Sequence, residues 1–205
     1  MQRLVLVLLM SLVLAACGDD STSDLDAEAV KRIAATVSGD GSGNVSCEGS
    51  SSRACLRLMG LGLTQLPSEI GELTNLQELQ LGGNRLTTLP AEIGQLTNLE
   101  KLNLWRNQLT SLPPEIGQLT NLRELYLRDN RLTTLPPEIG QLTKLESLDL
   151  RNNQLTSLPP EIEQLPKLEI LYLVGNTSLD ATSLALVQRL KAREDGGGGV
   201  SVVGP

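Results

Sequence analysis

The 205-residue sequence contains no histidine. Its absence excludes Ser-His-Asp and Cys-His nucleophilic catalysis, and it removes the commonest side-chain ligand for zinc and copper. An enzyme that uses only carboxylates, as glycosidases do, stays open in principle. We predict a chain that is not an enzyme and that carries no metal and no cofactor.

Positive charge and aromatic residues are also scarce. The formal net charge is −7 and the isoelectric point is near 4.7, whereas binding to nucleic acid requires clustered lysine and arginine. We therefore expect no nucleic-acid partner. Phenylalanine is absent, and the aromatic residues are one tryptophan and two tyrosines, Trp105, Tyr126 and Tyr172.

The one long apolar run lies at the start of the chain. Residues 1–16 consist of an n-region with Arg3, an apolar stretch and then small residues, which is the layout of a secretory signal peptide. The run is shorter than the roughly 20 apolar residues of a membrane-spanning helix. The next residue is Cys17, and the four residues Leu14-Ala15-Ala16-Cys17 resemble the lipobox of bacterial lipoproteins. That resemblance implies cleavage before Cys17, acylation of its sulfur and amino group, and stable membrane anchoring. An ordinary signal peptidase site beside an incidental cysteine is the alternative.

Only three cysteines occur, and an odd number in an exported chain requires an explanation. Lipidation of Cys17 leaves Cys47 and Cys55, which we predict to be joined because disulfides persist outside the cytoplasm. By resemblance to enteric lipoproteins, in which an aspartate directly after the lipidated cysteine favours retention in the inner membrane, Gly18 at that place favours the outer membrane over the inner membrane.

A repeat of constant length occupies most of the remaining chain. Five asparagines recur at intervals of 23 residues; they are Asn84, Asn107, Asn130, Asn153 and Asn176. Each ends the phrase L-x-x-L-x-L-x-x-N, which continues with x-L after the first four. A fixed period of this length with this phrase is typical of a leucine-rich repeat solenoid. The longer consensus, continued by T-x-L-P-x-E-I-G-x-L-T-N, resembles the repeats of Ras-suppressor-like and many bacterial leucine-rich repeat proteins. The resemblance covers residues 53 to about 178 and implies a curved α/β solenoid that binds other proteins.

Each repeat predicts one coil of such a solenoid. The L-x-L pair alternates with period 2 and predicts a short strand of a parallel sheet on the concave side. The LPPEIGQL stretch predicts a short helix or 3-10 turn on the convex side. We predict that each asparagine bonds buried backbone groups. The expected core of one repeat is Leu99, Leu102, Leu104, Leu109, Leu112, Ile116 and Leu119.

The sequence divides into four parts. Residues 1–16 form the signal peptide; 17–45 hold the lipidated cysteine, an acidic tether and a capping helix over 24–37; 46–178 are the repeats; and 179–205 form a C-terminal cap. In this last part Asp180 is placed to be an N-cap, Leu184, Val187 and Leu190 form an apolar stripe, and Val200, Val202 and Val203 predict an edge strand. Helix 24–37 and a Cys47–Cys55 bridge resemble the caps of extracellular leucine-rich repeat proteins.

The outward positions of the strands are the candidate binding site. All three aromatic residues fall at these positions, and Trp, Tyr and Arg are enriched at binding hot spots. The predicted partner-binding residues are Trp105, Tyr126, Arg128, Asp149, Arg151 and Tyr172. Within this set Trp105 and Arg128 are expected to stack, with Asp149 as a balancing acceptor.

These observations predict a membrane-anchored, exported protein that binds a protein partner through its concave sheet. Because Trp and Tyr also stack on sugar rings, a glycan or cell-wall binding protein is the alternative. A simpler explanation of the aromatic residues is that strands favour them.

Overall fold

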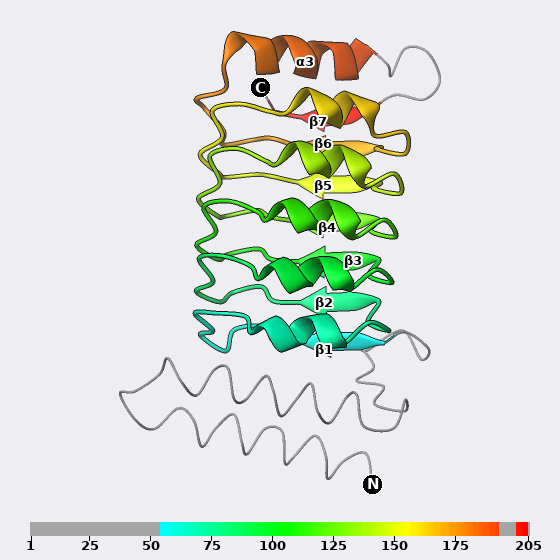
Figure 1. Cartoon of the computed structure of the whole chain (residues 1–205). Coiled ribbons are helices and arrows are strands. Elements are labelled where there is room, and N and C mark those ends of the chain that lie inside the picture. Colours follow the sequence, from blue (N-terminus) through cyan, green and yellow to red (C-terminus); the bar gives the residue numbers. More distant parts are fainter. Residues whose placement is uncertain (1–53, 193–199, 205) are drawn as a thin grey trace, which may run out of the picture.

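The computed structural model describes residues 54–192 and 200–204. Seven short strands form one parallel sheet in sequence order, β1 to β7, and the sheet does not close on itself. They are β1 (Cys55–Arg57), β2 (Glu78–Gln80), β3 (Lys101–Asn103), β4 (Glu124–Tyr126), β5 (Ser147–Asp149), β6 (Ile170–Tyr172) and β7 (Ser201–Val203). Figure 1 shows them stacked one above another, with one coil of chain per strand up to β6. The predicted curved solenoid, with its parallel sheet on the concave side, is confirmed.

The register between strands equals the repeat length. Glu78 pairs with Lys101, Lys101 with Glu124 and Glu124 with Ser147, so equivalent residues of successive coils are direct neighbours. The backbone ladder continues past the strands, because the amide of Arg106 donates to the carbonyl oxygen of Arg128 at 2.9 Å. Side chains 23 residues apart therefore form columns along the solenoid.

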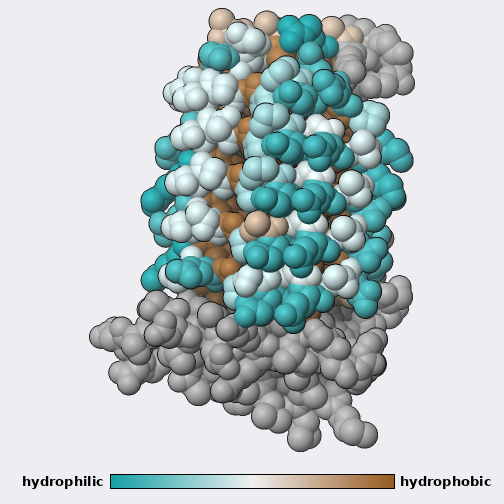
Figure 2. Space-filling model, viewed as in Figure 1, coloured by the Kyte–Doolittle hydropathy of each residue, from teal (hydrophilic) through white to brown (hydrophobic). Residues whose placement is uncertain are grey.

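The far side of each coil carries a 3-10 helix of five residues, which decides the helix type that the sequence left open. These are η2 (Ser68–Glu72), η3 (Ala91–Gln95), η4 (Pro114–Gln118), η5 (Pro137–Gln141) and η6 (Pro160–Gln164). A proline precedes each helix in extended conformation, and in η4 to η6 a second proline fills the first helical position, which needs no N–H donor. Figure 2 shows that this face is mainly hydrophilic, with apolar residues in the seams.

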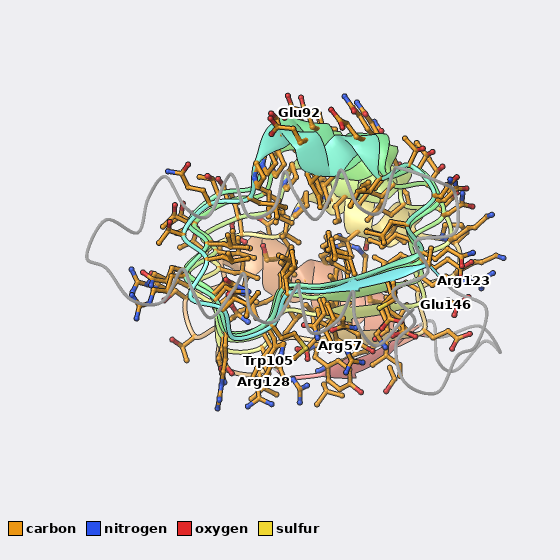
Figure 3. The ribbon with its side chains drawn as sticks, turned by 90° about the horizontal axis from the view of Figure 1, so that it is seen from below. Arg57, Glu92, Trp105, Arg123, Arg128 and Glu146 are labelled. Carbon is orange, nitrogen blue, oxygen red and sulfur yellow. The ribbon has the colours of Figure 1, made fainter. Side chains whose placement is uncertain are left out.

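Leucine fills the space between sheet and helices. Every predicted core residue of the repeat that begins at Leu99 is buried, with at most 5% of its surface exposed. Viewed along the solenoid axis, Figure 3 shows the helices and the sheet as two layers on opposite sides of this core. A lone coil has no such enclosed interior, and stacking on its neighbours provides it.

The asparagine column is structural, as predicted. The Oδ1 atom of Asn130 accepts from the amide of Leu109 at 3.0 Å in the preceding coil. Its Nδ2 donates to the carbonyl oxygens of Leu104 at 2.9 Å and Leu127 at 3.0 Å. Each asparagine thus ties its own turn to the coil before it. In the first coil Leu61 replaces the asparagine, and its amide donates to Asn84 instead, at 3.0 Å.

One residue before each asparagine, the backbone has a left-handed conformation. Glycine meets this requirement in the outer coils, at Gly60, Gly83 and Gly175. In the central coils Arg106, Asp129 and Asn152 adopt φ values of 51°, 56° and 53°. The left-handed region is uncommon for residues with a Cβ, so these coils carry local strain that the asparagine bonds offset.

The last coil is followed by helix α3 (Ala181–Ala192) and by β7. Asp180 is the N-cap as predicted, because its Oδ1 accepts from the amide of Ser183 at 2.7 Å, and bonding to Ser183 lowers the pKa of Asp180. The predicted apolar stripe is wrong at Leu184, which is 38% exposed. The buried face contains Ser183 instead, since its hydroxyl accepts from the amide of Leu158 at 2.8 Å. Leu186, Val187 and Leu190 complete that face.

Candidate functional site

Two columns on the outer face of the sheet contain the predicted binding residues. Trp105, Arg128 and Arg151 follow β3, β4 and β5 at equivalent positions, one coil apart. Tyr126, Asp149 and Tyr172 lie in direct register on β4, β5 and β6. Neighbouring strands are about 4.8 Å apart, so each column is a continuous row of side chains. Figure 3 shows Trp105 and Arg128 projecting from the sheet side of the molecule.

Trp105 is half-buried, and its indole packs over Gly82 of the preceding coil. A Cβ at Gly82 would overlap the Nε1 and Cδ1 atoms of the ring, so the glycine provides the space that the indole fills. The expected stacking of Trp105 on Arg128 is wrong. The guanidinium over the ring belongs to Arg106, 4.8 Å from the centroid, because the indole leans toward the earlier coil and away from Arg128. Arg128 instead approaches Asp129, with 3.2 Å between Nε and Oδ2.

Tyr126 is held by two residues that the sequence did not assign to the site. Its hydroxyl donates to Oε2 of Glu124 at 2.8 Å, and Nζ of Lys101 lies 2.9 Å from the same oxygen. Nζ is also 5.4 Å from the centroid of the Tyr126 ring. Burial raises the pKa of Tyr126 far above its ordinary value, and the hydrogen bond to anionic Glu124 raises it further. The phenol therefore stays protonated and keeps donating.

This arrangement predicts an alkaline titration. In the wild type, Tyr126 will ionise well above the ordinary tyrosine pKa of about 10. Replacing Glu124 by glutamine will lower the Tyr126 pKa, because the negative charge that opposes tyrosinate disappears; burial will keep it above the ordinary value. Because the folded-state pKa is raised, this tyrosine stabilises the fold below pH 10 or so and ceases to do so as pH rises through its folded pKa. Tyrosinate absorbance, with Tyr126→Phe to assign the step, measures the change; identical curves for wild type and Glu124→Gln would contradict it.

Asp149 positions Arg151. Only 3% of its surface is exposed, and it holds the guanidinium through Nε to Oδ1 at 2.9 Å and a second nitrogen to Oδ2 at 2.5 Å. It also accepts from the Arg151 backbone amide at 3.1 Å. The bond to Asp149 raises the pKa of Arg151. The guanidinium lies 4.6 Å from the centroid of the Tyr172 ring. Arg151 and Tyr172 thus lie together on the surface, and Asp149 orients the Arg151 guanidinium.

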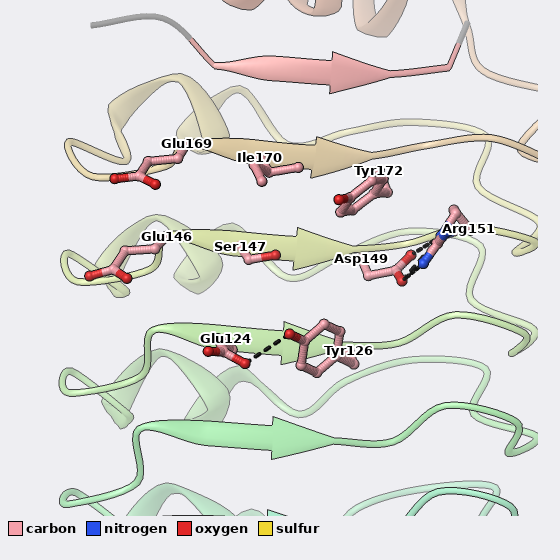
Figure 4. Close-up of a pocket in the computed structure, with 9 residues that line it drawn as sticks. All are labelled: Glu124, Tyr126, Glu146, Ser147, Asp149, Arg151, Glu169, Ile170 and Tyr172. Carbon is pink, nitrogen blue, oxygen red and sulfur yellow. Dashed lines mark hydrogen bonds and ion pairs between the residues drawn. The ribbon is translucent and has the colours of Figure 1, made fainter.

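A hollow of about 350 Å³ opens on this part of the sheet. Figure 4 shows its lining residues on β4, β5, β6 and the segments beside them. They are Glu124, Tyr126, Glu146, Ser147, Asp149, Arg151, Glu169, Ile170 and Tyr172. Four of the six predicted binding residues line this hollow, namely Tyr126, Asp149, Arg151 and Tyr172. Trp105 and Arg128 are not among its lining residues, and Trp105 lies two coils before Arg151.

Sequence reasoning places Gly82, Lys101 and Glu124 on the outward face of the sheet but does not include them among the binding residues. Glu124 and Lys101 occupy equivalent positions one coil apart, and Tyr126 lies two residues after Glu124 on the same face of β4. That spacing was a usable signal, since residues i and i+2 of a strand share a face. The place of Gly82 beneath an indole depends on the tryptophan rotamer, which no spacing encodes.

Several predicted features lie outside the described residues, namely the signal peptide, Cys17, the helix over 24–37 and Cys47. Cys55 is buried at the start of β1, and its predicted bond to Cys47 stays a prediction. Over residues 54–192 and 200–204, the side chains form no cluster of three or more cysteine or acidic residues arranged to hold a metal ion. Within the same ranges no helix has the length and apolar character needed to cross a lipid bilayer.

Two family models match the chain. A leucine-rich repeat region model covers residues 11–130, and a leucine rich repeat model covers residues 120–177. Such domains generally serve as non-enzymatic scaffolds for protein interaction. No curated protein matches the chain.

Several solved structures of leucine-rich repeat proteins are similar to this chain. A leucine-rich repeat protein of Leptospira interrogans is 36% identical over 72% of this chain and 48% of its own, with a TM-score of 0.45. The BIR3–SERK2 complex from Arabidopsis thaliana contains a chain that is 28% identical over 67% of this chain and 76% of its own, with a TM-score of 0.54. The leucine-rich repeat domain of the type III effector XopL is 27% identical over 83% of this chain and 66% of its own, with a TM-score of 0.52.

The likeness is partial in length. This chain spans about half of the Leptospira protein and 19% of the plant peptide hormone receptor RGFR1, whose structure is a complex with RGF2 and which is 30% identical over 57% of this chain, with a TM-score of 0.51. The repeat models nevertheless match more than half of the present sequence, and the register of 23 residues recurs on every strand pair from β1 to β6. The chain belongs to the leucine-rich repeat family.

Proposed function

We propose that this protein is an interaction module that binds a protein partner through the concave sheet. The observation that carries this proposal is the placement of all three aromatic residues, each half-buried, on the outward face of the sheet: Trp105 just after β3, Tyr126 on β4 and Tyr172 on β6. Similar domains in RGFR1 and in the BIR3–SERK2 pair have been solved in complex with a peptide hormone and with a second protein.

The rings are held in place before any partner binds. Trp105 is seated on Gly82, the hydroxyl of Tyr126 is bonded to Glu124, and Tyr172 lies against Arg151. Side chains that are already ordered lose less conformational entropy on binding, so more of their contact energy appears as affinity. A surface with fixed aromatic and arginine side chains is suited to a protein partner.

Replacement of Trp105 by alanine will weaken partner binding by about 2 kcal/mol or more, because a preordered aromatic anchor is lost. The partner is first identified by cross-linking to the full chain in its host, followed by mass spectrometry, and affinities are then measured by calorimetry. Circular dichroism will be unchanged, since Trp105 lies outside the leucine core. Leu184→Ala is the control, because it removes an exposed apolar side chain from α3, a helix that carries none of the predicted binding residues. Unaltered affinity of Trp105→Ala would reject this face as the binding site.

A glycan or cell-wall fragment is the alternative ligand. Sugar stacking requires an open aromatic face, yet each ring already has a cation near it, Arg106 at Trp105, Lys101 at Tyr126 and Arg151 at Tyr172. This arrangement favours a protein. Titration with cell-wall fragments, followed by Trp105 fluorescence, separates the two: a saturable change would favour the glycan.

We further propose that the protein is exported and anchored in the cell envelope through lipidated Cys17, with the outer membrane as its site. The support is the signal-peptide pattern of residues 1–16 and the motif Leu14-Ala15-Ala16-Cys17, which resembles a lipobox. Intact mass of the membrane-extracted protein should show a chain that begins at Cys17 and carries acyl groups, and Cys17→Ala should abolish both. The same non-reducing spectrum should show no free thiol at Cys47 and Cys55; two free thiols would remove the proposed bond.

A further inference from the structure

The hollow on the sheet has the shape of a trench that follows β5. Ser147 and the buried Asp149 form its floor. Its walls are the neighbouring strands, because Ser147 lies in register between Glu124 and Ile170, and Asp149 lies between Tyr126 and Tyr172. The trench exists because β5 presents a small residue and a buried one where the adjacent strands present larger side chains (Figure 4).

The lining is strongly acidic. Four carboxylates and one guanidinium face or border the trench. Three of the carboxylates form ion pairs: Glu124 with Lys101 at 2.9 Å, Glu146 with Arg123 at 2.5 Å, and Asp149 with Arg151. The fourth, Glu169, is exposed and has no lysine or arginine nitrogen within 4.0 Å among the described residues. Within the described part of the chain, one negative charge at the trench therefore has no lysine or arginine partner.

The uncompensated charge lies beside apolar surface. Ile170 directly follows Glu169, and the Tyr172 ring is on the same face of β6. Lysine and arginine combine a charged end with an apolar stem, and such side chains lay the stem along apolar surface while the charge meets an acid. Among the described residues that line the trench, Arg151 is the only cation, and Asp149 already engages it through two hydrogen bonds. An acidic side chain would also face the four carboxylates. Charge complementarity thus selects a cation, in agreement with the net charge of −7.

From this geometry we infer that the trench receives a lysine or arginine side chain of the protein partner. Its charged end lies against Glu169 and Glu146 at the start of β6 and β5, and its stem lies on Ile170 and Tyr172. The inference rests on the proposed function and adds the partner's chemistry: the contacting segment is basic, with a cationic side chain placed beside the aromatic anchors.

The test uses random peptides of about a dozen residues, displayed on phage and selected on the full-length protein. Recovered peptides are expected to be enriched in lysine or arginine, and their affinity should fall about fivefold or more in Glu169→Gln. This variant is isosteric and exposed, so folding is preserved, as thermal unfolding will verify. The matched control is Glu138→Gln, the same change of charge on helix η5 at the opposite face. Its affinity should equal that of wild type. Higher salt should weaken the wild type more than Glu169→Gln.

Two results would overturn the inference, and they differ in what they leave standing. Peptides that depend on Trp105 but show no basic enrichment, or bind Glu169→Gln as well as wild type, refute the cationic trench and leave the concave interaction surface intact. If every recovered peptide binds Trp105→Ala, Glu169→Gln and wild type equally, both the trench and the proposed binding face are refuted.

Discussion

Replacing Asn130 by alanine will lower the free energy of unfolding by about 3–5 kcal/mol. The side chain satisfies one buried amide and two buried carbonyl groups, and an unsatisfied buried group costs about 1–3 kcal/mol. Two of those three partners, Leu109 and Leu104, lie in the coil before Asn130. The loss therefore separates two coils as well as loosening one turn.

The matched control is Asn98→Ala. Asn98 also bonds the preceding coil, because its Nδ2 donates to the carbonyl oxygen of Thr74 at 2.9 Å, but it is exposed to water. Water replaces a lost bond at such a site, so the expected loss is below about 1 kcal/mol. Urea unfolding followed by far-ultraviolet circular dichroism measures both variants. Equal losses of unfolding free energy in the two variants would show that the buried hydrogen bonds of Asn130 stabilise the fold no more than the exposed bond of Asn98.

Replacing Gly117 by alanine will destabilise the fold by about 2–3 kcal/mol, through overpacking between coils. An added Cβ would lie 2.6 Å from the carbonyl oxygen of Glu138 and 2.9 Å from its Cβ, both in the next coil. The backbone of η5 could move away from the added Cβ only if its whole coil shifted. Gly71, Gly94 and Gly140 occupy equivalent places and have similar close neighbours.

These glycines are 23 residues apart, and the equivalent position in the next coil holds Glu163. Glu163 therefore provides the control. In the described chain no further 3-10 helix packs on η6, and α3 follows it instead. Oε1 of Glu163 forms an ion pair with Nε of Arg189 on α3, at 2.5 Å. Alanine at position 163 removes this exposed ion pair and should cost about 0–1 kcal/mol. If Gly117→Ala proves as harmless as Glu163→Ala, the coils are not packed as closely as the structure shows.

Glu163 also explains where the stack of 3-10 helices ends. A glutamate at this place is incompatible with another coil packed as closely as η5 packs on η4, since even a Cβ has no room there. It suits the wider approach of α3, whose Arg189 bonds it. The change from glycine to glutamate was readable in the sequence, but its meaning required knowing that this glycine faces the next coil.

The left-handed conformation of the turns could not be predicted from the sequence. Gly83 and Gly175 hinted at a left-handed residue before the asparagine, but Arg106, Asp129 and Asn152 at the same place hid the pattern. Local preference would not assign φ above 50° to an arginine. The asparagine bonds on the next residue stabilise that turn in every coil, so tertiary contacts override the local preference.

The amino-acid sequence by itself determined the coil length, the strand positions, the leucines that point inward and the columns to which Trp105, Tyr126 and Tyr172 belong. It did so because a constant period of 23 residues makes every coil repeat the geometry of the last. Only the tertiary structure decided that Trp105 leans on Gly82, that Asp149 lies beneath Arg151, and that a trench opens over Ser147. These outcomes depend on the volumes of side chains that meet across neighbouring coils, and one-dimensional spacing carries no information about how such neighbours share space.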